Sequence, residues 1–196
     1  MAYCNQTLAG ITLDCTNSMG GIKTVYIANY GDVEDVKVGD VKDGEDGEIT
    51  SIVMGLEIGP DGEPIKDAEG NNKTAKFKPY QFRKQTGSMT STLNVDETTG
   101  LNYVSTELNL VFTKMETAKR MEIAALSIGQ LAVIVEDCNG VFYYLGKDDY
   151  VSASAGGAQT GTSKSDANSY TLTLKDESKS YPYIIDASVL DTVIEK

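Results

Sequence analysis

The sequence predicts a mainly β fold: two packed antiparallel sheets, sandwich-like or barrel-like, with one flanking α-helix and a long projecting hairpin or loop. Several segments alternate apolar and polar residues with a period of two, which is typical of half-buried strands. The chain has 19 Gly, no Trp and many Thr and Ser, which favours strands and turns. Only one segment shows helical spacing. A length of 196 residues predicts one domain over 1–196.

The N-terminal third is divided into an arm, a strand and an acidic projection. Residues 1–21 show no sustained period, so we expect an irregular N-terminal arm that orders only against another surface. Alternation predicts a strand over Ile22–Asn29. Residues 31–72 are predicted to form a projecting hairpin or loop, with a strand near 48–54 and many turn signals.

Charge is distributed unevenly around this projection. Residues 31–70 contain 13 acidic residues and only three lysines, whereas residues 73–84 contain five basic residues and no acid. We therefore expect the two segments to meet, either within the chain or across a subunit boundary. The candidate interface residues are Asp40, Asp43, Glu45, Asp46 and Glu48 on the acidic side, and Lys73, Lys76, Lys78, Arg83 and Lys84 on the basic side.

Two other interpretations of these charged segments are weaker. Aromatic residues interleave the basic run as in a nucleic-acid stripe, but complementarity to the acidic segment explains the run better. The acids of 43–48 could ligate Ca²⁺, yet the order of an EF-hand loop is not met, which favours a solvated loop.

Regular alternation begins at Ser88. Residues 88–95 and 104–112 predict a β-hairpin with one apolar and one polar face. The pattern Thr113-Lys-Met-Glu116 is a capping box, so a helix is predicted over 114–128, with Gly129 as its left-handed cap.

The C-terminal part is predicted to return to strands. Strands at Leu131–Glu136 and Val141–Leu145 flank Asn139-Gly140, a strong hairpin signal. Residues 152–168 are predicted to be a flexible loop, and strands follow at 170–175 and 181–185 before a short C-terminal piece. No internal repeat is evident.

Composition excludes many catalytic classes. The chain has no His, which removes the usual general base near neutral pH, and its three cysteines fit neither a disulfide framework nor a zinc site. We expect no enzyme, no cofactor and no metal. A net charge of −12 disfavours binding to nucleic acid through its phosphates. Because neither a signal peptide nor a membrane span is evident, we expect no membrane partner and synthesis in a cytoplasm.

Four segments and the order of the predicted elements carry a resemblance to a known family. The segments are Ser88-Met-Thr-Ser-Thr-Leu93, Glu107-Leu-Asn-Leu-Val-Phe-Thr113, Met115-Glu-Thr-Ala-Lys-Arg120 and Ser180-Tyr-Pro-Tyr-Ile184. With them the chain resembles the major tail tube proteins of tailed bacteriophages, most strongly tube-like proteins of phages and prophages of gut Bacteroidales. The resemblance covers about half the chain.

The resemblance implies a structural virion protein that forms hexameric rings, which stack into a tail tube for DNA delivery. Its partners would be copies of itself, other tail proteins and viral DNA that passes without specific binding; it would be assembled in the host cytoplasm and located in the virion tail. The residues expected to line the lumen are Thr90, Thr92, Asn94, Ser105, Glu107 and Asn109. Two alternatives stay open: another virion part, such as a capsid decoration protein or a tail terminator or connector, and a cell-surface adhesin.

Overall fold

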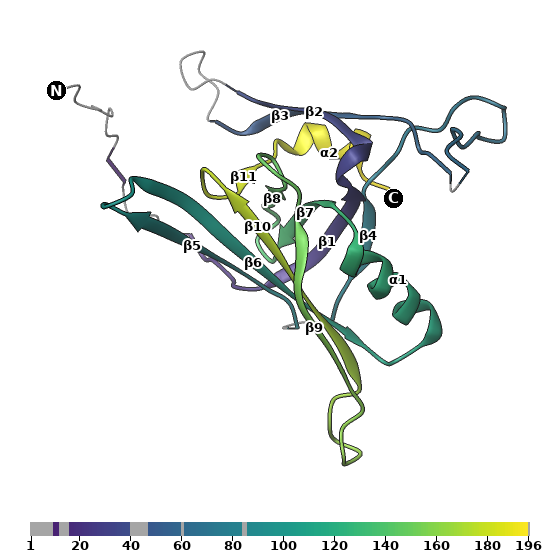
Figure 1. The fold of residues 1–196 in the computed structure, drawn as a ribbon, viewed down its shortest axis with the longest axis vertical. Coiled ribbons are helices and arrows are strands. Elements are labelled where there is room, and N and C mark those ends of the chain that lie inside the picture. The colour runs from purple at the N-terminus through teal and green to yellow at the C-terminus, as the bar shows by residue number, and fades with distance from the viewer. Residues whose placement is uncertain (1–9, 12–15, 40–46, 60, 84–85, 196) are drawn as a thin grey trace.

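The computed structural model describes residues 10–11, 16–39, 47–59, 61–83 and 86–195. Three antiparallel sheets and two helices form this part of the protein (Figure 1). The larger sheet has the order β11-β8-β7-β1-β4, with β1 Ile22–Asn29, β4 Lys78–Gln81, β7 Leu131–Asp137, β8 Phe142–Leu145 and β11 Tyr183–Ile184. The second has the order β5-β6-β10-β9, with β5 Ser88–Asp96, β6 Leu101–Thr113, β9 Ser152–Gln159 and β10 Ser169–Ser178. The smallest pairs β2 Val33–Val38 with β3 Ile49–Met54, and the helices are α1 Thr117–Ile128 and α2 Ala187–Val193.

The four-stranded sheet packs against one face of the five-stranded sheet, which confirms the predicted fold class. Alternate residues of each strand point into the space between the sheets, as the period of two requires. Helix α1 contributes to one side of this core through Leu126. The core residues of the strands are Ile22, Val25, Ile27, Leu131, Val133, Val135 and Leu145 from the larger sheet, and Leu108, Leu110, Leu172 and Leu174 from the smaller one.

A second core lies on the other face of the five-stranded sheet. There α2 and β3 cover Ala132, Ile134 and Tyr144, together with Phe77. Strand β7 is therefore covered on both faces, which explains why Leu131 to Glu136 are all buried. Helix α2 was not predicted: the sequence suggested only a short C-terminal piece, whereas its Val189, Leu190 and Val193 are all buried.

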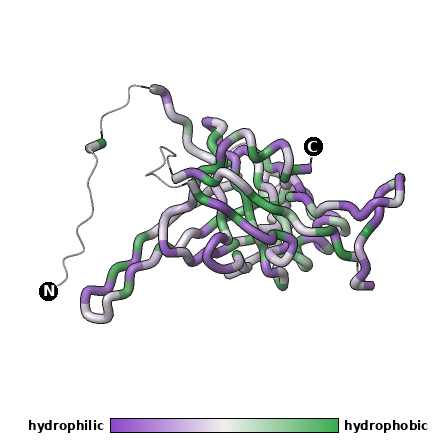
Figure 2. Tube along the Cα trace, turned by 90° about the horizontal axis from the view of Figure 1, so that it is seen from above, coloured by the Kyte–Doolittle hydropathy of each residue, from purple (hydrophilic) through white to green (hydrophobic). Residues whose placement is uncertain are grey.

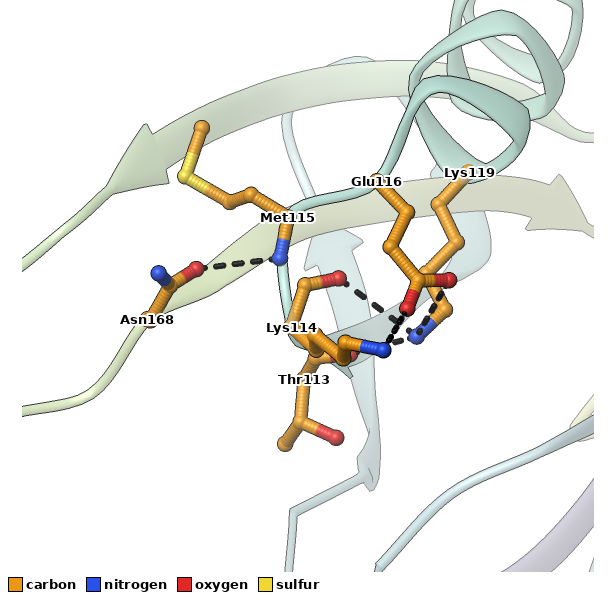
Figure 3. Close-up of polar contacts among 6 residues, drawn as sticks. All are labelled: Thr113, Lys114, Met115, Glu116, Lys119 and Asn168. Carbon is orange, nitrogen blue, oxygen red and sulfur yellow. Dashed lines mark hydrogen bonds and ion pairs between the residues drawn. The ribbon is translucent and has the colours of Figure 1, made fainter.

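The start of α1 corrects the capping-box prediction. The helix begins at Thr117 rather than at 114, because Thr113 is still paired in β6 and Lys114 has a φ of 68° that breaks the helical path. Figure 3 shows what replaces the box: the side-chain oxygen of Asn168 accepts the Met115 N–H at 3.0 Å, and Lys119 Nζ donates to the Thr113 carbonyl at 2.6 Å.

The other end of α1 also differs from the prediction. The Gly129 N–H bonds to the Ala125 carbonyl, but the residue is extended, with a φ of −75° and a ψ of 150°, and is not a left-handed cap. The chain turns directly into β7 from there.

The predicted flexible loop 152–168 is wrong in its first half. Residues 152–159 form β9, which pairs with β10 along its length and contains a bulge near Ser154. The segment is rich in Ala, Gly and Ser, so neither propensity nor alternation marks it as a strand. Backbone hydrogen bonds to β10 provide its stability, and a shorter connection of 160–168 remains.

The acidic projection consists of two parts rather than one long hairpin. Strands β2 and β3 form the first part, and their connecting tip includes residues 40–46, which lie outside the described residues. The second part, residues 55–75, repeats its backbone hydrogen bonds every eight residues. The Gly59 N–H bonds to Glu63 O as Asp67 N–H does to Asn71 O, and Gly62 and Gly70 both have positive φ. A short repeat of turns is thus present that the sequence did not reveal.

Three backbone hydrogen bonds stabilise this second part of the projection. The Glu57 N–H donates to Lys73 O, the Lys73 N–H to Ile65 O, and the Ile65 N–H to Glu57 O, each at 2.8 Å. This closed cycle gives the projection a defined shape although it contributes few side chains to either core.

The described end of the N-terminal arm is fastened to the β7-β8 turn. The Met19 N–H donates to the Asn139 side-chain oxygen at 2.7 Å, and the Asn139 amide donates back to Met19 O at 2.9 Å. Gly140 has the positive φ of 81° that the predicted Asn-Gly turn requires. Residues 1–9 and 12–15 lie outside the described residues.

Candidate interaction surfaces

The first surface is the polar outer face of the four-stranded sheet. Strands β5, β6 and β10 each turn their core residues inward, so the intervening residues form one outward face. Seven of these residues line a shallow concavity of about 280 Å³: Thr90, Thr92, Asn94, Tyr103, Ser105, Glu107 and Lys175. Five of the six predicted lumen residues are therefore neighbours on one face.

The sixth predicted residue, Asn109, lies on the same face farther along β6. Its side-chain oxygen accepts the hydroxyl of Thr173 at 2.8 Å. The sequence did not identify Thr173 or Lys175 as members of this surface. Both belong to the polar alternation of β10, but only the pairing of β10 with β6 places them beside Asn109 and Glu107.

The polar face carries charges of both signs. Glu107 pairs in register with Lys175, and Lys175 Nζ donates to Glu177 Oε1 at 2.6 Å. This hydrogen bond raises the pKa of Lys175, so the lysine stays charged near neutral pH. Glu107 and Glu177 carry two negative charges against the one positive charge of Lys175, so this part of the polar face is slightly acidic. Small polar side chains surround these three residues.

The second surface consists of the two edges of the same sheet. Strand β5 pairs only with β6, and β9 pairs only with β10, within the part of the chain that the structure describes. The strands have nine and eight residues, so each edge offers a long row of unpaired backbone groups. Unprotected edges of this length invite pairing with another chain.

The third surface is the charged projection with the basic segment that follows it. Glu57 contacts Lys73 at 2.8 Å and Lys78 at 3.8 Å. The hydrogen bond from Lys73 lowers the pKa of Glu57, which keeps the carboxylate ionised. Here the acidic and basic segments meet within one chain. Glu57 was not among the predicted interface residues, although it is one of the acidic residues of the 31–70 segment that was expected to meet the basic one.

The remaining predicted interface residues are placed as follows. Glu48 is half-buried next to β3 and its carbonyl accepts the Gly39 N–H, so it forms part of the hairpin backbone. Lys76 lines a cavity of about 210 Å³ together with Lys78, and Arg83 is exposed. Asp40, Asp43, Glu45, Asp46 and Lys84 lie outside the described residues.

Neither a metal centre nor a membrane helix is found in the described ranges. No three of their Cys, Asp and Glu side chains are grouped so that they could hold a metal ion. None of their helices combines the length and the apolar character that crossing a bilayer requires.

Comparisons of the chain with models of protein families, with curated proteins and with solved structures found no match. The function of the protein is therefore inferred from its three surfaces.

Proposed function

We propose that this protein is a structural subunit that assembles with copies of itself into rings, and that the rings stack into the tail tube of a tailed bacteriophage. The observation that carries the proposal is the four-stranded sheet, which is unpaired at both edges and exposes a polar face over β5, β6 and β10. A long edge strand that nothing covers is a site at which another chain can pair and aggregate, and native proteins usually protect such edges. Pairing of each edge with a neighbouring subunit removes that liability.

Strand directions support closure into a ring. The strands alternate in direction along the order β5-β6-β10-β9, so β5 and β9 run opposite to one another. A second copy in the same orientation can place its β5 beside the first copy's β9 as an antiparallel pair. The two edges differ, so the contact is head-to-tail, and such contacts close into rings or continue as helices.

The polar face suits a channel for DNA. Glu107 and Glu177 outnumber Lys175 there, and the remaining side chains are mainly small and polar. Affinity for DNA rises with the number of phosphates that basic residues neutralise. A lining without a basic excess therefore lets the duplex slide. On this proposal Thr90, Thr92, Asn94, Ser105, Glu107 and Asn109 face the lumen.

The test is the assembly state of the purified protein. Sedimentation velocity over a range of concentrations, followed by negative-stain electron microscopy, is expected to give rings and stacked tubes with a central channel. Rings that never stack would favour a capsid decoration protein or a tail terminator. A protein that stays monomeric at all concentrations would overturn the proposal.

A further inference from the structure

The β5-β6 hairpin leaves apolar side chains uncovered. Met89 on β5 packs against the first core, and Leu93 and Val95 follow on the same face of the strand. They are nevertheless 45% and 61% exposed, because this end of the hairpin extends past the five-stranded sheet. Figure 2 shows the hairpin projecting from the body with alternating apolar and polar residues.

An apolar groove lies at the opposite edge of the same sheet. Helix α1 forms one wall with Ile123 and Ala124, and the other side is formed by β9 with Leu172 behind it. The groove has a volume of about 530 Å³ and is lined mostly by apolar atoms. It stays open because Ala153, Gly156 and Ala158 of β9 have little or no side chain to fill it.

We infer that Leu93 and Val95 of one copy of this chain dock in the groove between α1 and β9 of the next copy. The inference rests on the proposed head-to-tail assembly. In it, Leu93 and Val95 are the side chains that stabilise the contact between neighbouring copies. When β5 pairs with the neighbour's β9, the core-facing side of β5 continues the core-facing side of β9. The exposed apolar residues of the hairpin then enter the space under the neighbour's α1.

The stagger of the sheet brings the two surfaces to the same level. Ser88 pairs with Asn109, Asn109 pairs with Thr173, and Thr173 pairs with Ala155. The first residue of β5 thus lies level with the middle of β9, and the two strands extend past opposite ends of the sheet. Closed barrels need such a stagger. If the same shift from strand to strand continues into the next copy, the β5 that pairs with β9 is displaced along it by a further step. This displacement places Leu93 and Val95 beside residues 153–158.

Charge complementarity favours the same occupant. Arg120 is the charged residue that lines the groove, and no ion pair of its guanidinium occurs among the residues that the structure describes. The hairpin that would enter carries Asp96 and Glu97 directly after Val95. A second copy therefore supplies both the apolar side chains and the opposite charge.

The experiment compares two disruptive variants with a matched control. Leu93→Asp places a charge on the docking face, and Ala158→Trp fills the groove from within its own chain. Each is expected to raise the concentration needed for assembly at least about tenfold, because apolar burial at every contact is lost. The control Ile184→Asp makes a comparable apolar-to-acid change at a side chain that is 40% exposed, on β11 of the five-stranded sheet, and is expected to assemble as the wild type does. Circular dichroism verifies that all three variants are folded.

Mixing the two disruptive variants tests the pairing itself. Each retains the surface that the other lacks, so an equal mixture is expected to form a dimer that cannot grow. Absence of this dimer, or assembly of Leu93→Asp like the wild type, would overturn the inference while rings of the wild type still support the proposed function. A wild type that never self-associates would overturn both.

Discussion

Helix α2 closes the second core, and the substitution Leu190→Ala measures how much it contributes. Leu190 is 5% exposed and packs with Val189 and Val193 against the five-stranded sheet. Truncation removes about three methyl or methylene groups, or about 2.4 kcal/mol of transfer free energy at about 0.8 kcal/mol each. A residual cavity raises the cost toward the range of about 2–5 kcal/mol that buried Leu→Ala changes show. We expect a loss of about 3 kcal/mol.

The assay is urea unfolding of the monomer followed by circular dichroism, with thermal unfolding as a second measure. For a chain of this length, a loss of about 3 kcal/mol corresponds to a fall in Tm of about 6–12 °C. Leu101→Ala is the matched control, because it removes the same groups from a side chain that is 56% exposed. A loss for Leu190→Ala no larger than that of Leu101→Ala would refute the assignment of α2 to the core.

Three further predictions concern a buried acid, a junction and the polar face. Burial raises the pKa of the Asp176 carboxyl above its ordinary range, so the folded protein binds this proton more tightly than the unfolded chain does. The contribution of Asp176 to stability therefore falls as the pH rises above the ordinary pKa of an aspartate, about 3.9. The stability advantage of Asp176→Asn over the wild type is therefore expected to grow from about pH 4 upward, and a pH-independent difference in urea unfolding would contradict this. Asn168→Ala removes the acceptor of the Met115 N–H and should cost about 0.5–1.5 kcal/mol by the same assay, against no change for Ser165→Ala. Glu107→Lys should make assembled protein retain duplex DNA on a filter at low salt, whereas Glu107→Gln should do so far less; equal retention by both would show that charge on this face does not govern sliding.

The predictions that succeeded depended on local patterns. The hairpin of β5 and β6 was evident because alternation of apolar and polar residues reports one buried and one exposed face. The turn at Asn139-Gly140 was evident because a positive φ restricts the choice of residues. The same alternation predicted that Thr90 to Asn94 and Ser105 to Asn109 share a polar face, and five of the six residues line one concavity.

The predictions that failed depended on neighbours distant in sequence. The capping box at Thr113 fitted a helix start, but pairing of β6 with β10 extends through Thr113 and moves the start to Thr117. Strand β9 has almost no apolar pattern, and it is a strand because β10 provides its hydrogen bonds. The role of α2 could not be read from seven residues, since a helix this short is stable only through packing.

Local patterns in the sequence were enough to predict that the fold is mainly β, that one hairpin has a polar face and that acidic charge is concentrated after the first strand. These properties follow from composition and from the side-chain periods of strands and helices, which act over a few residues. The order of the strands became known only from the three-dimensional structure, which shows that β5 and β9 are the two edges of one sheet. Strand order depends on contacts between residues far apart in the chain, and no local period records them.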